Sequence, residues 1–370
     1  MTVMSESVGE TRLMERVAVL VASKDGAATI ADTVASARAQ ADVYVVSDGS
    51  SDDTARASRQ AGATVLDLST NVGKPAALHR ACQHFGLFAR YEFVAILDDD
   101  TVIADDFVRQ CLRTFAQRPE NVIVVGRTIS DWPREKRWNP WIAARAYSYW
   151  RYQVALRRGQ SAVNALNCVS GSNSMYRSSL LRNVLVENNP YIVDDTYWVL
   201  ETHRRKLGRV SYEPDAHAII QDPTSMRDWY KQNLRWLWGT FQGIIGHKVG
   251  RTRSWFDFWY VGLILDWLLY LFAWPALLIV AITSDRIPAL FVLLYMFVGY
   301  SIWIGAASIA LKRYSLLLFL PFIVVFDWLY RVNFIHAWCK ALRHKTVASC
   351  TWESPTRYST DDGRVPQATP

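Results

Sequence analysis

Short apolar segments alternate with polar, helix-compatible segments over the first two thirds of the chain. The apolar runs have the length of buried strands and occupy 17–22, 43–46, 64–68, 93–97 and 122–125. Helical patterns separate them, for example at 27–39 and 105–118. This alternation predicts an α/β domain with a mostly parallel sheet flanked by helices. In such a sheet, ligands bind beyond the carboxyl ends of the strands.

Beyond about residue 250 the pattern changes to long apolar stretches, at 258–282, 287–311 and 314–330. The first two reach the roughly 20 residues that a helix needs to cross a bilayer. A buried, soluble helical domain is the weaker alternative. The pattern divides the chain into four parts: a polar tail (1–15), an α/β domain (16–250), interfacial and transmembrane helices (251–345) and a C-terminal tail (346–370).

The third apolar stretch differs from the other two because it contains Pro321 and Asp327. Three crossings would carry the basic residues that follow it to the far side, against the positive-inside tendency. We therefore expect two crossings, with the third stretch re-entrant or interfacial and the tail on the side of the α/β domain. The polar, acidic segment 1–15 has no apolar core of a signal peptide, which favours a cytoplasmic α/β domain.

The net charge of +7 is compatible with the predicted membrane protein. Basic residues are interspersed with acidic ones and gather near the apolar stretches, which favours an anionic bilayer surface over nucleic acid. The five cysteines show no close pairing or metal-ligand spacing, and their odd number favours a reducing compartment.

Three adjacent carboxylates, Asp98, Asp99 and Asp100, follow the apolar run at 93–97. Their mutual repulsion needs an opposing charge, and Mg²⁺ and Mn²⁺ prefer oxygen ligands of this kind. Side chains alternate in an extended segment, so Asp98 and Asp100 should share the metal while Asp99 points elsewhere. An acidic loop without a metal is the weaker alternative.

Two further strand–helix turns carry a charged residue each. Asp48 could accept hydrogen bonds from a base N–H or a ribose hydroxyl, and Lys74 could meet a diphosphate as a point charge. A turn or cap residue and a solvated lysine remain open as alternatives. The glycine-rich phosphate motifs of kinases and dinucleotide enzymes are absent from the sequence.

Two later segments have the character of an acceptor site. The small, polar residues around Ser170 and Gly171 could let a sugar approach the backbone closely. Asp194 and Asp195 open a helical pattern, where a carboxylate either caps the helix or acts as a general base.

Together with Gln232-x-x-Arg235-Trp236, these motifs resemble one family in their order. They are similar to the D, DxD, (E/D)D and QxxRW signature of membrane-integrated family 2 glycosyltransferases, the group of the hyaluronan, chitin and cellulose synthases. The resemblance covers most of 17–250, and Asp194, where cellulose-type enzymes have Glu, makes the hyaluronan and chitin branch the nearer match. The segment 352–357 resembles the terminal Trp/Arg motif of several such synthases.

The resemblance implies a GT-A-type fold and a role for each residue. On the donor side, Asp48 and Lys74 would hold the nucleotide, Asp98 its ribose or diphosphate side, and Asp100 the metal. Gln232 and Arg235 would reach the diphosphate. On the acceptor side, Asp195 would be the base with Asp194 supporting it, and Trp236 would stack on the sugar.

The sequence therefore predicts a metal-dependent inverting enzyme that moves a sugar from a nucleotide donor, with UDP favoured, to a growing polysaccharide at the membrane, with export. The alternative is non-processive glycosylation of a membrane lipid. A rival of another class is a non-catalytic, nucleotide-sugar-binding membrane scaffold. The predicted partners are the donor, a glycan or lipid acceptor and the bilayer, without nucleic acid; a homo-oligomer is left open.

Overall fold

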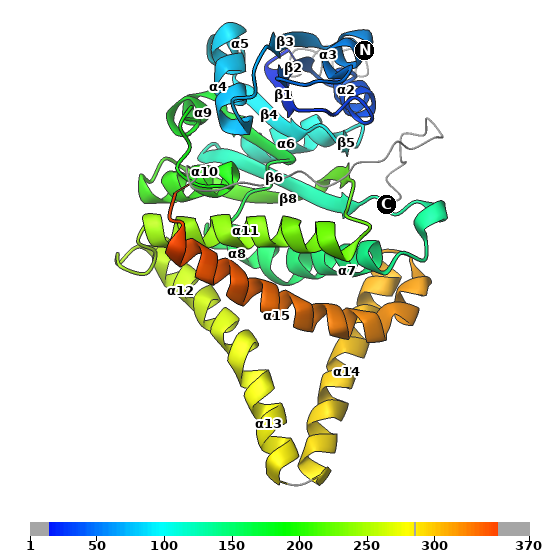
Figure 1. The fold of residues 1–370 in the computed structure, drawn as a ribbon. Coiled ribbons are helices and arrows are strands. Elements are labelled where there is room, and N and C mark those ends of the chain that lie inside the picture. The colour runs from blue at the N-terminus through cyan, green and yellow to red at the C-terminus, as the bar shows by residue number, and fades with distance from the viewer. Residues whose placement is uncertain (1–14, 285, 347–370) are drawn as a thin grey trace, which may run out of the picture.

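The computed structural model describes residues 15–284 and 286–346 (Figure 1). The strands are β1 (Val17–Ser23), β2 (Asp42–Asp48), β3 (Thr64–Leu68), β4 (Phe93–Asp98), β5 (Thr101–Ile103), β6 (Asn121–Ser130), β7 (Asn173–Arg177) and β8 (Arg209–Ile220). The helices are α2 (Ile30–Arg38), α3 (Thr54–Gln60), α4 (Lys74–His84), α5 (Leu87–Arg90), α6 (Phe107–Gln117), α7 (Pro140–Tyr152), α8 (Arg158–Ala162), α9 (Ser178–Val184), α10 (Asp194–Arg204), α11 (Met226–Gly246), α12 (Trp255–Leu268), α13 (Trp274–Ser284), α14 (Arg286–Ala310) and α15 (Leu320–Arg343). Short 3₁₀ turns occupy η1 (Arg134–Lys136) and η4 (Tyr314–Phe319), and π-helical turns occupy η2 (Gln153–Arg157) and η3 (Leu269–Ala273).

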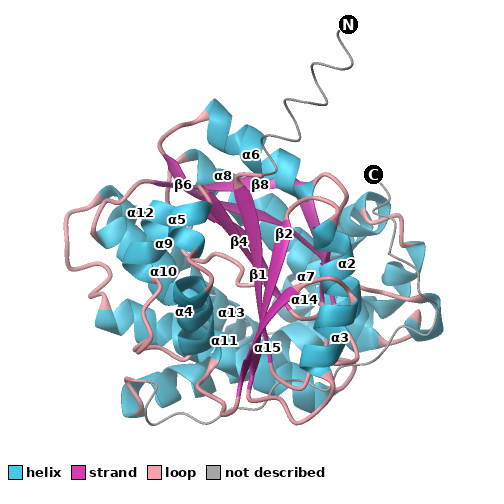
Figure 2. Cartoon of the chain, turned by 90° about the horizontal axis from the view of Figure 1, so that it is seen from above, coloured by secondary structure: helices cyan, strands magenta, loops and turns pink. Residues whose placement is uncertain are grey.

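The strands form one sheet in the order β3-β2-β1-β4-β7-β6-β8-β5. The first four are parallel, β7 is antiparallel to both of its neighbours, β6 and β8 are parallel, and β5 is antiparallel to β8. Figure 2 shows helices on both faces of this sheet. The α/β architecture and the mostly parallel sheet predicted from the sequence are confirmed, and so are its five predicted strands.

The central strands are apolar at consecutive positions because both of their faces are covered. Leu20 of β1 and Ile96 of β4 belong to a core on one face of the sheet. Their neighbours Val19 and Leu97 belong to a separate core on the other face. All four side chains are fully buried, so neither face of β1 or β4 tolerates a polar residue without cost.

Helix α15 lies along the α/β domain, beside α11, as Figure 1 shows. Just before the helix, Arg313 Nη2 donates to the carbonyl of Trp132 over 3.0 Å. Just after it, the carbonyl of His344 accepts from Trp238 Nε1 at 3.2 Å and from Gln242 Nε2 at 2.8 Å. Both ends of α15 are thus fastened to the domain, and the helix runs on to Arg343, well beyond the apolar stretch at 314–330.

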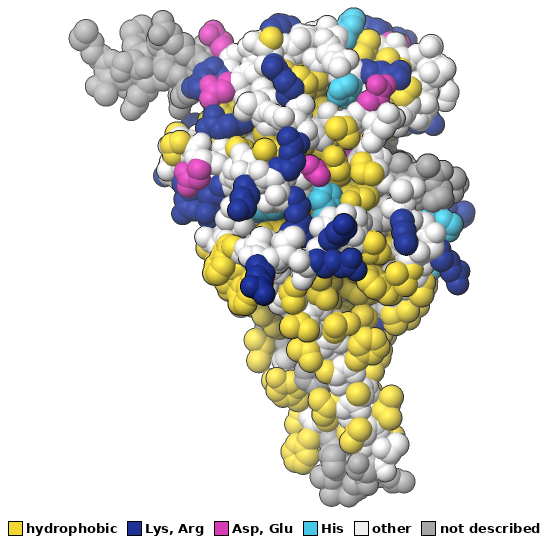
Figure 3. Space-filling model, turned by 90° about the vertical axis from the view of Figure 1, so that its left-hand side faces the viewer, with side chains coloured by type: hydrophobic (Ala, Val, Ile, Leu, Met, Phe, Trp, Pro, Cys, Tyr) yellow, Lys and Arg dark blue, Asp and Glu magenta, His cyan; other side chains and the backbone are white. Residues whose placement is uncertain are grey.

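Two other apolar segments lead away from the domain as the arms of a V, one formed by α12, η3 and α13 and the other by α14 (Figure 1). By length and composition, three segments of the described chain could cross a membrane: Trp255–Thr283, Ala289–Ala310 and Tyr314–Arg343. Large apolar side chains such as Leu269, Phe291 and Ile302 are exposed along the arms. Figure 3 shows this apolar surface below a region dotted with lysine and arginine. Such a surface is that of a membrane protein.

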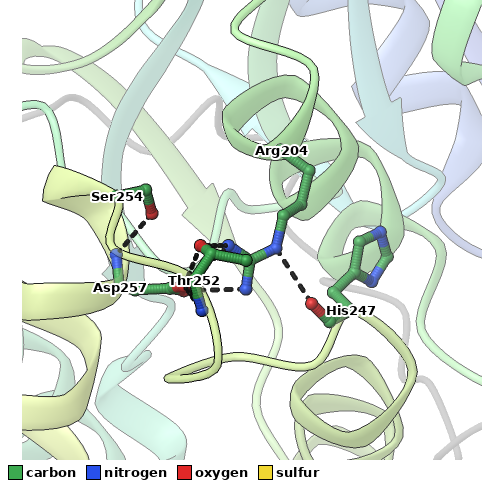
Figure 4. A network of polar contacts seen from close by, with 5 residues as sticks. All are labelled: Arg204, His247, Thr252, Ser254 and Asp257. Carbon is green, nitrogen blue, oxygen red and sulfur yellow. Dashed lines mark hydrogen bonds and ion pairs between the residues drawn. The ribbon is translucent and has the colours of Figure 1, made fainter.

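A network of polar contacts joins the domain to the first arm (Figure 4). Arg204, at the end of α10, binds the carboxylate of Asp257 with two N–H···O contacts of 2.7 and 2.9 Å. The same guanidinium donates to the carbonyl of His247 at 2.9 Å and to Oγ1 of Thr252 at 2.8 Å. Ser254 caps α12 by accepting from the Asp257 N–H. Helix α10 is therefore tied directly to the start of α12.

Candidate functional site

Asp48 and Asp98 end two strands of the parallel half of the sheet, on either side of β1. Parallel strands present their carboxyl ends at one edge, so the two residues lie on the same rim of the sheet. The turns that follow these strands, together with the starts of α4 and α10, build the candidate site.

Asp48 is buried and fixes the turn that leads into α4. Its Oδ1 accepts the Val72 N–H at 2.7 Å, and its Oδ2 accepts the Gly73 N–H at 2.9 Å. Gly49, at φ +64°, packs so closely that a Cβ there would lie 2.4 Å from the Asn71 nitrogen. The turn after β2 and the turn before α4 are thus locked together, which sets the position of Lys74.

Lys74 lies at the centre of the candidate site. Its Nζ donates to Asp98 Oδ1 at 2.5 Å and to the carbonyl of Gly171 at 3.4 Å. Burial acts to lower the pKa of Lys74, but the carboxylates of Asp98, Asp194 and Asp195 outweigh it and raise the pKa. The lysine is therefore a permanent positive charge among carboxylates from two different elements.

The three aspartates at the end of β4 differ in their surroundings. Asp99 is buried and accepts from Ser23 Oγ at 2.6 Å, while Asp98 and Asp100 are only partly buried. Within the described residues, no group of three or more His, Cys, Asp or Glu side chains is arranged to hold a metal. Asp98 and Asp100 can offer two hard oxygen donors, so a divalent ion would complete its shell with substrate phosphate oxygens, as Mg²⁺ commonly does. The residues fit such an ion.

Asp194 and Asp195 begin α10, opposite Lys74. The Gly171 N–H donates to Asp195 Oδ2 at 2.9 Å. Burial and the neighbouring Asp194 raise the pKa of Asp195 to about 7, against the opposing effects of Lys74 and the Gly171 N–H. A carboxylate that exchanges its proton near neutral pH has the property required of a general base.

Gly171 separates Lys74 from Asp195. A Cβ at this position would lie 3.2 Å from Asp195 Oδ2 and 3.2 Å from Lys74 Nζ. Beside it, Ser170 Oγ is hydrogen bonded to Ser172 Oγ at 2.7 Å. The small residues of this segment therefore allow a lysine, a backbone and a carboxylate to share one confined space.

Gln232, Arg235 and Trp236 lie on α11 and are each partly buried. Gln232 Oε1 accepts from Arg145 Nη2 at 2.7 Å, and the Arg145 guanidinium lies over the Trp236 ring, 4.9 Å from its centroid. Both Gln232 and Trp236 thus contact Arg145 of α7, an element that the sequence analysis did not connect with any site.

Arg145, Tyr149 and Asp222 are the residues that sequence reasoning missed. Asp222 is fully buried, lies 3.5 Å from Arg145 Nε, and has a pKa raised to about 6, chiefly by burial. Burial raises the pKa of Tyr149, and the carboxylates of both Asp222 and Asp100 raise it further. Tyr149 is therefore close enough to both Asp100 and Asp222 for their charges to act on its hydroxyl. The motifs identified in the sequence do not include these three residues.

The predicted Trp/Arg motif at 352–357 lies outside the residues that the structure describes.

Comparison with known proteins gives a family. The family model described as "Glycosyltransferase like family 2" matches residues 15–239. A poly-beta-1,6-N-acetyl-D-glucosamine synthase of Staphylococcus epidermidis is 27% identical over 68% of this chain and 58% of its own length. The protein of that name from Staphylococcus aureus strain COL is 26% identical over 64% of this chain and 56% of its own length. The chain thus spans a little over half the length of these curated relatives.

A solved structure is also similar. Glucosyl-3-phosphoglycerate synthase from Mycobacterium tuberculosis, in complex with Mg²⁺ and uridine diphosphate, matches with a TM-score of 0.43 and 16% identity. The match covers 64% of this chain and 82% of that protein.

Proposed function

This chain belongs to glycosyltransferase-like family 2, and we propose that it moves a sugar from a UDP-linked donor onto a growing polysaccharide at the membrane. The observation that carries the proposal is the meeting of Lys74, Gly171 and Asp195. A fixed positive charge and a carboxylate with a pKa of about 7 face each other across a residue without a side chain. Transfer from a nucleotide sugar needs such a pair, a cation for the departing diphosphate and a base for the attacking hydroxyl.

On the donor side, Lys74 and Arg235 bind the diphosphate, together with Gln232. Asp98 orients Lys74 through their 2.5 Å contact and faces the ribose or diphosphate. Asp48 holds the turn at Val72 and Gly73, against which the nucleotide binds. Asp98 and Asp100 would hold Mn²⁺ or Mg²⁺, and that ion, when bound, neutralises the charge that develops on the diphosphate.

On the acceptor side, Asp195 takes the proton of the attacking hydroxyl. The acceptor oxygen forms a bond to the anomeric carbon while the bond from that carbon to the diphosphate oxygen breaks, and UDP leaves with the electron pair. Attack from the face opposite the diphosphate inverts the anomeric centre. Asp194 supports this step because its charge helps to hold the pKa of Asp195 near neutrality. Ser170 and Gly171 leave room for the sugar beside the base.

A growing polysaccharide is the favoured acceptor because the relatives named above are synthases of poly-beta-1,6-N-acetyl-D-glucosamine. Trp236 offers an aromatic ring on which a terminal sugar can stack. We further propose that the domain (16–250) is cytoplasmic and that the polymer leaves across the membrane. The two arms of the V would cross, and α15 would lie at the membrane surface, since both of its ends are fastened to the domain.

Glycosylation of a membrane lipid is the second candidate. It is favoured by the small number of apolar segments that lead away from the domain in the described chain, namely the two arms of the V. A single product of lipid size would be its signature.

Purified full-length protein in nanodiscs with Mn²⁺ tests the proposal. UDP-N-acetylglucosamine, UDP-glucose, UDP-glucuronate and UDP-galactose are offered singly and in pairs, UDP release is measured and the product is sized. Release with a polymer product supports the proposal, and release that needs added lipid and ends at one discrete product favours the second candidate. If no donor gives UDP release above that of Asp195→Asn, the proposed activity is wrong.

A further inference from the structure

Arg145 of α7 is a buried cation that contacts Gln232, Asn233 and Trp236 of α11. Its side chain is about 5% exposed, and it reaches three residues of α11 at once. Nη1 donates to Asn233 Oδ1 at 3.0 Å, Nη2 donates to Gln232 Oε1 at 2.7 Å, and the guanidinium carbon lies over the Trp236 ring, 4.9 Å from its centroid. Gln232 and Trp236 are themselves partly exposed, whereas Arg145 is buried.

The guanidinium is held from its other sides as well. Nε lies 3.5 Å from the fully buried carboxylate of Asp222, and the Tyr149 ring lies one helical turn further along α7, with its centroid 5.3 Å from the guanidinium carbon. The neighbours of Arg145 come from three parts of the chain. Asp222 lies in the segment after β8, Tyr149 lies on α7, and Gln232, Asn233 and Trp236 lie on α11. A planar fork with donors in fixed directions suits this arrangement, whereas the three N–H groups of a lysine diverge from a single nitrogen and cannot reproduce the spacing of the fork.

These contacts have two consequences for α11. The hydrogen bond to Oε1 holds the Gln232 amide in one orientation. The guanidinium occupies one face of the Trp236 ring, so only the opposite face is available for stacking.

We propose that Arg145 is a positioning residue for the acceptor: it orients Gln232 and Trp236 and restricts the acceptor sugar to one face of the Trp236 ring. The inference rests on the proposed function, because it presumes that a sugar acceptor binds at Trp236. Arg145 acts only through its neighbours on α11 and contacts neither donor nor acceptor.

The test compares Arg145→Lys with the wild type in nanodiscs, using UDP-N-acetylglucosamine and a β-1,6-linked N-acetylglucosamine oligomer as acceptor. Lysine keeps the charge opposite Asp222 but loses the fork and the flat contact with Trp236. We expect the acceptor KM to rise about tenfold, roughly the loss of one stacking or orienting interaction. The donor KM should rise less, because Gln232, which Arg145 also orients, is one of three residues assigned to the diphosphate. Arg151→Lys is the matched control, since Arg151 lies on the same helix, is exposed, and stacks on Trp303 instead.

A second measurement separates positioning from a general loss of structure. If Arg145 acts through Trp236, then Arg145→Lys changes the acceptor KM much less in a Trp236→Ala background than in the wild type. Equal effects in both backgrounds, or an unchanged acceptor KM, would overturn the inference. If Arg145→Lys does not fold, Asn233→Leu removes the hydrogen bond from Arg145 Nη1 without altering the pair with Asp222 or any residue assigned to the donor, and a rise in acceptor KM is expected.

Failure of the inference differs visibly from failure of the proposed function. If the wild type neither releases UDP nor binds the oligomer in calorimetry, both the proposed function and the role of Arg145 are wrong. If the wild type is active and Arg145→Lys has a normal acceptor KM, only the role of Arg145 is wrong.

Discussion

The backbone N–H of Gly171 donates to Asp195 Oδ2 at 2.9 Å, and the missing side chain of Gly171 leaves the space that separates this carboxylate from Lys74. A methyl group there would lie 3.2 Å from both charged groups, closer than ordinary van der Waals contact. Both neighbours are side-chain ends, so the fold can accommodate the change by moving them by a few tenths of an ångström.

Gly171→Ala should therefore lower turnover without lowering stability. Small displacements of catalytic groups are costly, and we expect a loss of roughly tenfold in kcat with an unchanged thermal unfolding midpoint. Gly159→Ala in α8 is the control, because nothing lies within 4 Å of a Cβ at that position. A variant with normal kcat would show that the distance between Lys74 and Asp195 is not critical.

Asp195→Asn should abolish transfer while leaving donor binding intact. An amide cannot accept the proton of the attacking hydroxyl, and a general base contributes about 10²- to 10⁴-fold to rate. The measurements are UDP release and the affinity for UDP by calorimetry. Asp32→Asn, on the exposed first turn of α2, is the matched control. Substantial activity in the Asp195 variant would support the non-catalytic scaffold.

The pH profile should reflect the raised pKa of Asp195. With a pKa of about 7, the carboxyl is protonated and inactive as a base below that pH, and ionised above it. We expect kcat/KM to fall about tenfold per pH unit below pH 7 and to level off above it. Because the Asp194 charge contributes to the raised pKa, Asp194→Asn should move this limb to lower pH. A flat profile from pH 5.5 to 8.5 would contradict the assignment.

The contact between Arg204 and Asp257 should carry much of the attachment of the first arm. Asp257 is buried, so Arg204→Met leaves its carboxylate without a cation, a loss of about 3–5 kcal/mol for a buried pair. Thermal unfolding in detergent should show a lower midpoint. Arg205→Met is the control, since the exposed Arg205 side chain pairs with the partly buried Glu201 over 3.7 Å, and this long contact should contribute less than about 1 kcal/mol. Equal midpoints for the two variants would show that the network is dispensable.

The two-crossing topology predicts which residues are reachable from outside the cell. In a cysteine-free background, Thr283→Cys, near the tip of the V, should react with an impermeant maleimide in intact cells. Lys345→Cys, next to the carbonyl that Trp238 and Gln242 hold, should react only after permeabilisation. Labelling of Lys345→Cys in intact cells would mean that α15 crosses the membrane.

Part of the site could be read from local sequence because it depends on the period of a strand. Alternation along an extended segment separates Asp99 from Asp98 and Asp100, and Asp99 is indeed the buried one, bonded to Ser23. Likewise, apolar runs at consecutive positions predict central strands covered on both faces, as β1 and β4 are. Parallel strands must end at a common edge, so the approach of Asp48, Lys74 and Asp98 also followed from the order of elements.

Other features were decided by contacts between distant segments, which leave no local pattern. Strand β7 reads Asn-Ser-Met-Tyr-Arg and has no strand-like alternation, yet it is held between β4 and β6 by hydrogen bonds on both edges. Arg145 and Asp222 lie far apart in the chain and meet only because α7 packs beneath the segment after β8. The sequence by itself determined which strands are apolar enough to be buried and which carboxylates end them, since the apolar pattern and the period of a strand are local properties. Only the tertiary structure decided that α15 lies along the domain and that Arg145 holds α11, because both depend on which surfaces pack together.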